Sequence, residues 1–185
     1  MLALHFLLVF GRGVRLFTIG QYGHPLDDPR SIDLWRCAAD EGLHVIVTVL
    51  ADGLPALDAA LDTLPRVPVS LDHCGFPELT GPPWTDQAAL FALARHENLH
   101  LKVSTHVLDA AEQATGDPGS FARALAEHFG AERMMWGSDF CQTHDRSYAE
   151  LVALGRRAFE GLPPDDRALV LGGTALRLWP ALGAA

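Results

Sequence analysis

The chain has 185 residues, of which 49% are hydrophobic and 20% charged, and its formal net charge is −9. These values predict a single globular domain over residues 1–185, and the negative charge argues against a nucleic-acid partner, which needs a basic surface. The three cysteines form no C-x-x-C pair, so no disulfide framework or cysteine-rich zinc site is expected, and a cytoplasmic location is predicted.

The first ten residues are apolar, but this stretch is too short to cross a bilayer and lacks the flanks of a signal peptide. It is predicted to be a buried element, and no membrane partner is expected. Apolar runs bounded by turn signals predict strands at 13–19, 44–50, 67–73, 99–105 and 133–139. Helical periodicity predicts helices at about 31–41, 53–64, 82–98, 118–130, 145–161, 164–171 and 174–179.

Strands that alternate with helices predict a parallel sheet, as either a doubly wound sheet or a barrel. No G-x-G-x-x-G or P-loop motif supports a nucleotide-binding sheet, and polar residues on the strands (Arg15, Thr48, Asp72 and Lys102) suit the mouth of a barrel. The predicted class is therefore α/β, of the (β/α)8 TIM-barrel type. Five strands are too few for a complete barrel, so about five carboxyl-terminal β/α units of a longer enzyme are expected. A half barrel completed by a partner chain is the alternative.

Polar side chains stand at the ends of three neighbouring predicted strands. They are His73 after the third strand, Lys102, Ser104 and His106 at the fourth, and Asp139 and His144 at the fifth. The ends of parallel strands meet on one rim, so these groups are expected to converge. An imidazole and a carboxylate there suit metal ligation or base catalysis on a water molecule. Lys102, His106 and His144 are predicted to contact the substrate.

The same residues also have structural roles as alternatives to the functional ones. Asp139 is of a type that often caps backbone amides, Lys102 has Asp72 as an ion-pair partner, and Arg15 has strand carbonyls within reach. A thiol nucleophile at Cys74 or Cys141 with His73 is a further alternative. Adjacent strand residues point to opposite faces, which places Cys74 poorly for that role.

Four segments together carry a resemblance to a known family. They are "PVSLDHCG", "HENLHLKVST", "FGAERMMWGSDF" and "LGGTALRLWP". In this order they resemble the amidohydrolase-related family, also called amidohydrolase 2, whose members include metal-dependent decarboxylases and lactonases. The resemblance implies a (β/α)8 barrel, with Asp139 as metal ligand or general base and His73 as metal ligand or catalytic histidine. It also implies that Arg15 binds a substrate carboxylate.

The sequence departs from the family pattern at the metal ligands. It has no H-x-H pair, and Thr48 stands where metal-dependent members have a histidine. The resemblance therefore implies a lactonase-like hydrolase of a small lactone or amide, in which Asp139 and His73 activate water. A divalent metal (zinc, or manganese or iron) takes part if the full-length enzyme is metal-dependent. The alternatives are a metal-dependent decarboxylase acting on a carboxylate and a non-catalytic scaffold, and the family suggests a homodimer.

Overall fold

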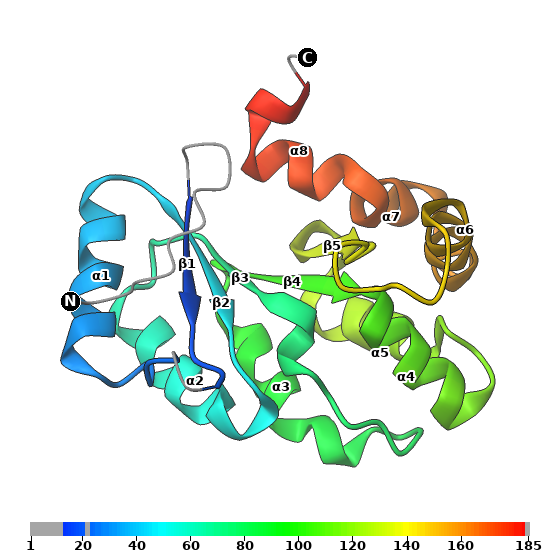
Figure 1. Cartoon of the computed structure of the whole chain (residues 1–185), viewed down its shortest axis with the longest axis horizontal. Coiled ribbons are helices and arrows are strands. Elements are labelled where there is room, and N and C mark those ends of the chain that lie inside the picture. Colours follow the sequence, from blue (N-terminus) through cyan, green and yellow to red (C-terminus); the bar gives the residue numbers. More distant parts are fainter. Residues whose placement is uncertain (1–12, 21–22, 184–185) are drawn as a thin grey trace.

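A single parallel sheet organises the molecule, and the computed structural model describes residues 13–20 and 23–183 of it. The five strands lie side by side in chain order (Figure 1). They are β1 (Gly13–Phe17), β2 (His44–Thr48), β3 (Val69–Leu71), β4 (Leu99–Ser104) and β5 (Met134–Gly137). Neighbouring parallel strands in chain order are the arrangement of a (β/α)8 barrel, of which this sheet supplies five strands. The apolar element predicted for the first ten residues lies outside the described part of the chain.

Helices follow the strands, and those from α1 to α5 cover one side of the sheet (Figure 1). They are α1 (Pro29–Asp40), α2 (Leu54–Thr63), α3 (Ala88–Ala92), α4 (Thr105–Thr115), α5 (Ser120–Phe129), α6 (Tyr148–Ala158), α7 (Pro164–Ala168) and α8 (Thr174–Leu178). No helix in the described ranges combines the length and apolar character that a membrane crossing requires.

Local sequence signals set several helix ends. The side chain of Asp28 accepts a hydrogen bond from the amide of Arg30 ahead of α1, and Gly42, with φ of 64°, ends that segment. Ser147 and Glu150 form a reciprocal capping box at the start of α6. These contacts satisfy backbone groups that the helices themselves leave open.

The two faces of the sheet differ in chemistry. One face contributes alternate apolar residues to the core shared with the helices, such as Val45 and Val47 of β2 and Leu101 of β4. The opposite face, here called the inner face, carries polar residues from neighbouring strands. These are Arg15, His44, Thr48, Ser70, Asp72, His100 and Lys102. The apolar face holds the helices in place, and the inner face is available for chemistry.

The parallel α/β architecture is confirmed, and several of its parts differ from the prediction. No helix was predicted between the fourth strand and residue 118, but helix α4 lies there, buries Val107, Leu108 and Ala111, and is capped by Gly116. The helix predicted at 82–98 is limited to α3, with short 3-10 turns on either side. The third strand was expected to run to residue 73, but it ends at Leu71. The reason is an unusual turn that begins directly after it.

Candidate active site

The turn after β3 has a left-handed backbone over four consecutive residues. The φ angles are 53° at His73, 51° at Cys74, 78° at Gly75 and 54° at Phe76. Residues other than glycine seldom adopt this conformation, which costs roughly 1–2 kcal/mol for each of them. Such strain is found most often at functional sites, where the surrounding structure maintains it. The turn leads the chain out of the strand and directs His73 toward β4.

His73 is held on two sides. Its Nδ1 atom lies 2.7 Å from the hydroxyl oxygen of Ser104 at the end of β4, and its ring packs against Phe76 with a centroid distance of 4.4 Å. Burial lowers the pKa of His73, and the negative charges of Asp72 and Asp139 oppose that shift only in part. The ring is therefore neutral at pH 7.

Asp139 follows β5 and also has a left-handed backbone, with φ of 50°. Its main-chain carbonyl accepts hydrogen bonds from the amides of Gln142 and Thr143, at 2.9 and 3.0 Å. The preceding carbonyl, of Ser138, accepts one from the hydroxyl of Thr105 at 2.8 Å. Within the described residues no backbone amide donates a hydrogen bond to the Asp139 side chain, so the capping role left open above is not observed.

The carboxylate of Asp139 is left largely free. Within the described residues its one hydrogen-bond contact is the thiol of Cys141, with 3.9 Å between Sγ and Oδ1. A carboxylate with open lone pairs on a backbone fixed by its own carbonyls is well placed to accept a proton.

A buried aspartate that received no functional role in the sequence analysis lies at the centre of the inner face. The carboxylate of Asp72 pairs with Arg15 at 3.0 Å and with Lys102 at 2.9 Å, and it accepts a hydrogen bond from Thr48 at 2.7 Å. The pairing of Lys102 with Asp72 is confirmed, whereas Arg15 binds this carboxylate rather than strand carbonyls. Two cations against one carboxylate leave a positive charge at this point, and Arg15 Nε is buried with no partner in the described part.

A hollow of about 510 Å³ opens beside Asp139. His106 from α4 and His144 from the loop after β5 line it together with Asp139 and Phe76. The loop is tied to α4 because Arg146 pairs with Asp109, with 2.9 Å between Nη1 and Oδ1. The structure thus brings three of the predicted residues to one hollow.

Arg15 and Lys102 form a separate group around Asp72 and do not line this hollow. His73 does not line the hollow, but it is near both groups, since the charges of Asp72, Lys102, Asp139 and His106 all act on its pKa. The predicted residues therefore form two clusters joined by one imidazole.

The donor set for a metal is incomplete. Protein zinc sites use three or four side-chain ligands. No three His, Cys, Asp or Glu side chains come together in the part of the chain that the structure describes. His73 and Asp139 alone do not form such a site, so their role as metal ligands stays a prediction.

The cysteines give little support for a thiol nucleophile. Cys74 packs in the core, its thiol contacts the carbonyl of Lys102, and burial raises its pKa far above the usual range. A thiolate, which is the reactive form, is strongly disfavoured there.

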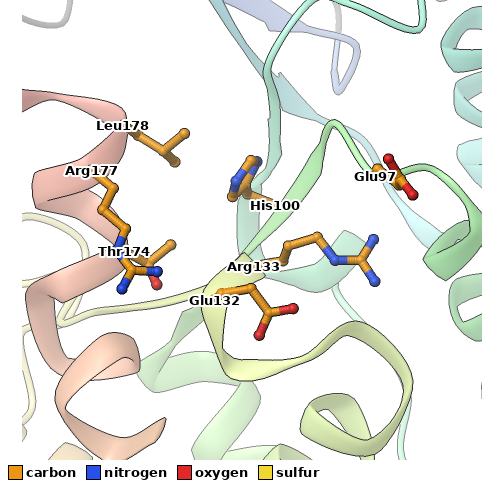
Figure 2. A pocket seen from close by; sticks show the side chains of 7 residues that line it. All are labelled: Glu97, His100, Glu132, Arg133, Thr174, Arg177 and Leu178. Atoms are coloured by element: carbon orange, nitrogen blue, oxygen red, sulfur yellow. The ribbon is translucent and has the colours of Figure 1, made fainter. Parts of the chain in front are cut away.

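A second hollow, of about 500 Å³, lies at the amino ends of the strands and is lined by His100, Arg133 and Arg177 among others (Figure 2). Figure 2 shows the two arginine side chains extending in different directions. The guanidinium of Arg133 donates hydrogen bonds to the main-chain carbonyls of Phe129, Ala94 and His96. At this end of a barrel such residues serve stability rather than catalysis.

Comparisons with known proteins identify the family of this chain. The family model described as amidohydrolase matches residues 11–181, nearly the whole chain. The chain therefore belongs to the amidohydrolase family. It is 32% identical over 135 residues to the L-fucono-1,5-lactonase of Burkholderia ambifaria. That match covers 68% of this chain and 46% of the lactonase, so the chain spans about half the length of this relative.

Solved structures show the same fold. A candidate 2-pyrone-4,6-dicarboxylic acid hydrolase from Pseudomonas putida is 28% identical with a TM-score of 0.73, over 91% of this chain and 63% of that one. An amidohydrolase from Burkholderia multivorans, solved with bound zinc, is 25% identical with a TM-score of 0.72, over 91% and 64% of the chains. A TIM-barrel protein from Bordetella bronchiseptica, 22% identical with a TM-score of 0.65 over 90% and 56%, supports the fold alone. The described sheet is thus an incomplete barrel of this type.

Two contacts at the site were missed by the sequence analysis. Asp72 was considered only as a polar residue at the barrel mouth and as a partner for Lys102, although the motif "LDHCG" places it next to His73. Ser104 was noted at its strand end, but nothing in the sequence indicated its contact with His73.

Proposed function

We propose that this chain carries the carboxyl-terminal part of a lactonase-type active site, in which Asp139 activates water and His73 polarises the carbonyl of a small lactone. The main support is the presence of both a free carboxylate, at Asp139, and an imidazole whose neutral form is favoured, at His73, at the carboxyl ends of the strands. The names of the relatives from Burkholderia ambifaria and Pseudomonas putida, a lactonase and a candidate pyrone hydrolase, support the same class of substrate.

The proposed reaction needs one proton acceptor and one donor. A water oxygen attacks the lactone carbonyl carbon while its proton passes to the Asp139 carboxylate. The carbonyl oxygen gains negative charge and accepts a hydrogen bond from His73. When the intermediate collapses, the ring C–O bond breaks and the leaving oxygen takes the proton from Asp139. The product is a hydroxy acid, and Asp139 returns to its carboxylate form.

The positive group at Arg15 and Lys102 is proposed to select substrates that carry a carboxylate. The two cations exceed the single charge of Asp72 by one, and Arg15 has an N–H without an acceptor. A planar guanidinium suits a carboxylate partner. His106 and His144, which line the hollow next to Asp139, are proposed to contact the rest of the substrate.

Lactone hydrolysis tests the proposal directly. The assay uses the purified protein with any sequence that flanks these residues in its gene, and follows acid release from L-fucono-1,5-lactone and 2-pyrone-4,6-dicarboxylate. Asp139→Asn should lower kcat at least about 100-fold with the fold intact by circular dichroism, because the amide cannot accept the proton. Asp165→Asn, the same change at an exposed position of α7, should leave kcat unchanged.

Either of two results contradicts the proposal. If no lactone is hydrolysed by the parent protein, the proposed class of reaction is wrong. If Asp139→Asn retains activity close to that of the parent, Asp139 is not the base.

A further inference from the structure

We propose that Ser104 is a positioning residue that holds His73 in the tautomer with its proton on Nε2, so that the ring presents an N–H donor to the site. The geometry behind this inference does not depend on the reaction, but its meaning for catalysis rests on the proposed function. Nothing in the family comparison assigns a role to this serine.

The contact between the two side chains is short and buried. Ser104 Oγ lies 2.7 Å from His73 Nδ1, and Ser104 is only 4% exposed. Ser104 precedes α4 at the position where a serine usually caps a helix, yet its side chain makes no capping bond. In the described part of the chain, the imidazole is the one partner of this hydroxyl.

The number of protons available fixes the direction of the bond. A buried hydroxyl proton needs an acceptor, and His73 Nδ1 is the acceptor within reach of Ser104. If Nδ1 carried the proton instead, it would donate to the hydroxyl and the buried hydroxyl proton would be left without a partner. Donation from Ser104 satisfies both groups, so Nδ1 is unprotonated and Nε2 carries the hydrogen of the neutral ring.

This tautomer separates the roles of the two functional groups. The Asp139 carboxylate can only accept hydrogen bonds, whereas His73 with an Nε2 proton can donate one. Their chemistry therefore matches the two needs of lactone hydrolysis, a base for water and a donor for the carbonyl oxygen. With the other tautomer, His73 would offer a lone pair, and the site would contain two acceptors.

The strained turn and Phe76 support the same orientation. The left-handed backbone at His73 turns the ring toward β4, and Phe76 packs against it at 4.4 Å between centroids. Ser104 thus completes the placement by binding Nδ1, which leaves Nε2 as the ring nitrogen without a hydrogen-bond partner in the described part of the chain.

Nuclear magnetic resonance of the ring nitrogens tests this inference without a substrate. Protein labelled with ¹⁵N at its nine histidines is studied at mildly alkaline pH, where His73 is neutral, and its signals are assigned with His73→Gln. In the parent protein, Nδ1 of His73 should resonate far downfield of Nε2, as an unprotonated nitrogen does. In Ser104→Ala, the separation between the two signals should shrink, because both tautomers become populated.

The chain offers a matched control. His44 Nε2 also lies 2.7 Å from a buried serine, Ser70 on β3. Ser70→Ala removes an equivalent contact from the same sheet, so it should move the His44 signals and leave those of His73 in place. This comparison separates a specific effect on the tautomer from a general effect of losing a buried hydroxyl.

Two results would overturn the inference. One is an unprotonated Nε2 on His73 in the parent protein, which needs no variant. The other is an unchanged nitrogen separation in folded Ser104→Ala. If that variant does not fold, Ser104→Thr keeps the hydroxyl and must preserve the parental pattern. Failure of the lactonase assay would leave these results unaffected, so the two proposals fail separately.

Discussion

Two histidine–serine pairs on the inner face place the same side chains in different surroundings. The pair of His73 and Ser104 lies at the carboxyl ends of the strands, beside Asp139. The pair of His44 and Ser70 lies toward the amino ends, where the ring of Trp179 covers His44 at 4.7 Å between centroids. Burial, with smaller effects from His100 and Lys102, lowers the pKa of His44 to about 3. The ring of His73 is partly exposed, whereas both members of the second pair belong to the interior.

The buried neutral ring of His44 predicts a loss of stability in acid. Its pKa in the folded state, about 3, is below its usual value of 6.5, so the unfolded chain binds more protons between these limits. The contribution to the free energy of unfolding is complete above pH 6.5. It is lost as the pH falls toward 3, by at most about 1.4 kcal/mol per pH unit.

Urea unfolding across this pH range, compared between the parent and His44→Gln, measures this contribution. The variant removes the titrating ring and keeps a polar side chain for Ser70. Carboxylates such as Asp117, whose pKa the Arg123 guanidinium lowers, affect both proteins equally. The difference in stability should therefore be constant above pH 6.5 and change below it. Parallel curves over the whole range would show that His44 titrates normally.

At the scale of the elements, close contact between helices depends on glycine at one position. A Cβ atom at Gly119, just before α5, would lie 2.2 Å from the main-chain carbonyl oxygen of Ala158 at the end of α6. Gly119 has φ of −89°, so its backbone is unstrained and the contact alone excludes a side chain. Gly119→Ala should lower the free energy of unfolding by about 2 kcal/mol, as measured by chemical denaturation.

Gly116 provides the comparison for this substitution. Its φ is 78°, but a Cβ atom there would meet nothing within 4 Å. Gly116→Ala should cost about 1 kcal/mol from backbone strain alone. Equal stability of the two variants would mean that the helices move apart without cost.

The same elements show how far the sequence could predict the fold. Strands and most helices were located because apolar runs, glycines and prolines mark their ends. Helix α4 was missed because it begins at Thr105, directly after β4, with no turn residue between them. The left-handed turn could not be predicted, because Cys74 and Phe76 are residue types that seldom adopt this conformation.

The residues of the candidate site were predicted more readily than their contacts. Strand ends and polar side chains identify His73 and Asp139. Their partners come from other strands, as Ser104 does, and depend on register and side-chain direction. The contacts of the Asp72 carboxylate illustrate this limit. Its three partners, Arg15, Thr48 and Lys102, each lie at least 24 residues away in sequence.

At the scale of the whole molecule, Asp72 joins four of the five strands. Its carboxylate, directly after β3, binds Arg15 from β1, Thr48 from β2 and Lys102 from β4. The Asp72 side chain is 4% exposed, while those of Arg15 and Lys102 are 31% and 26% exposed. Loss of this charge would leave two partly buried cations facing each other across the inner face, with no carboxylate between them.

Asp72→Asn should therefore lower the free energy of unfolding by about 3 kcal/mol, near the lower limit for breaking a buried ion pair because the cations are partly hydrated. Denaturation in urea measures the loss, and amide hydrogen exchange should report faster opening of β1 to β4 together. The matched change is Asp62→Asn, which removes a carboxylate that pairs with Arg95 on the surface and should alter stability little. If the two variants were equally stable, the four strands would not depend on Asp72, and its carboxylate would serve only to orient Arg15 and Lys102 for a substrate.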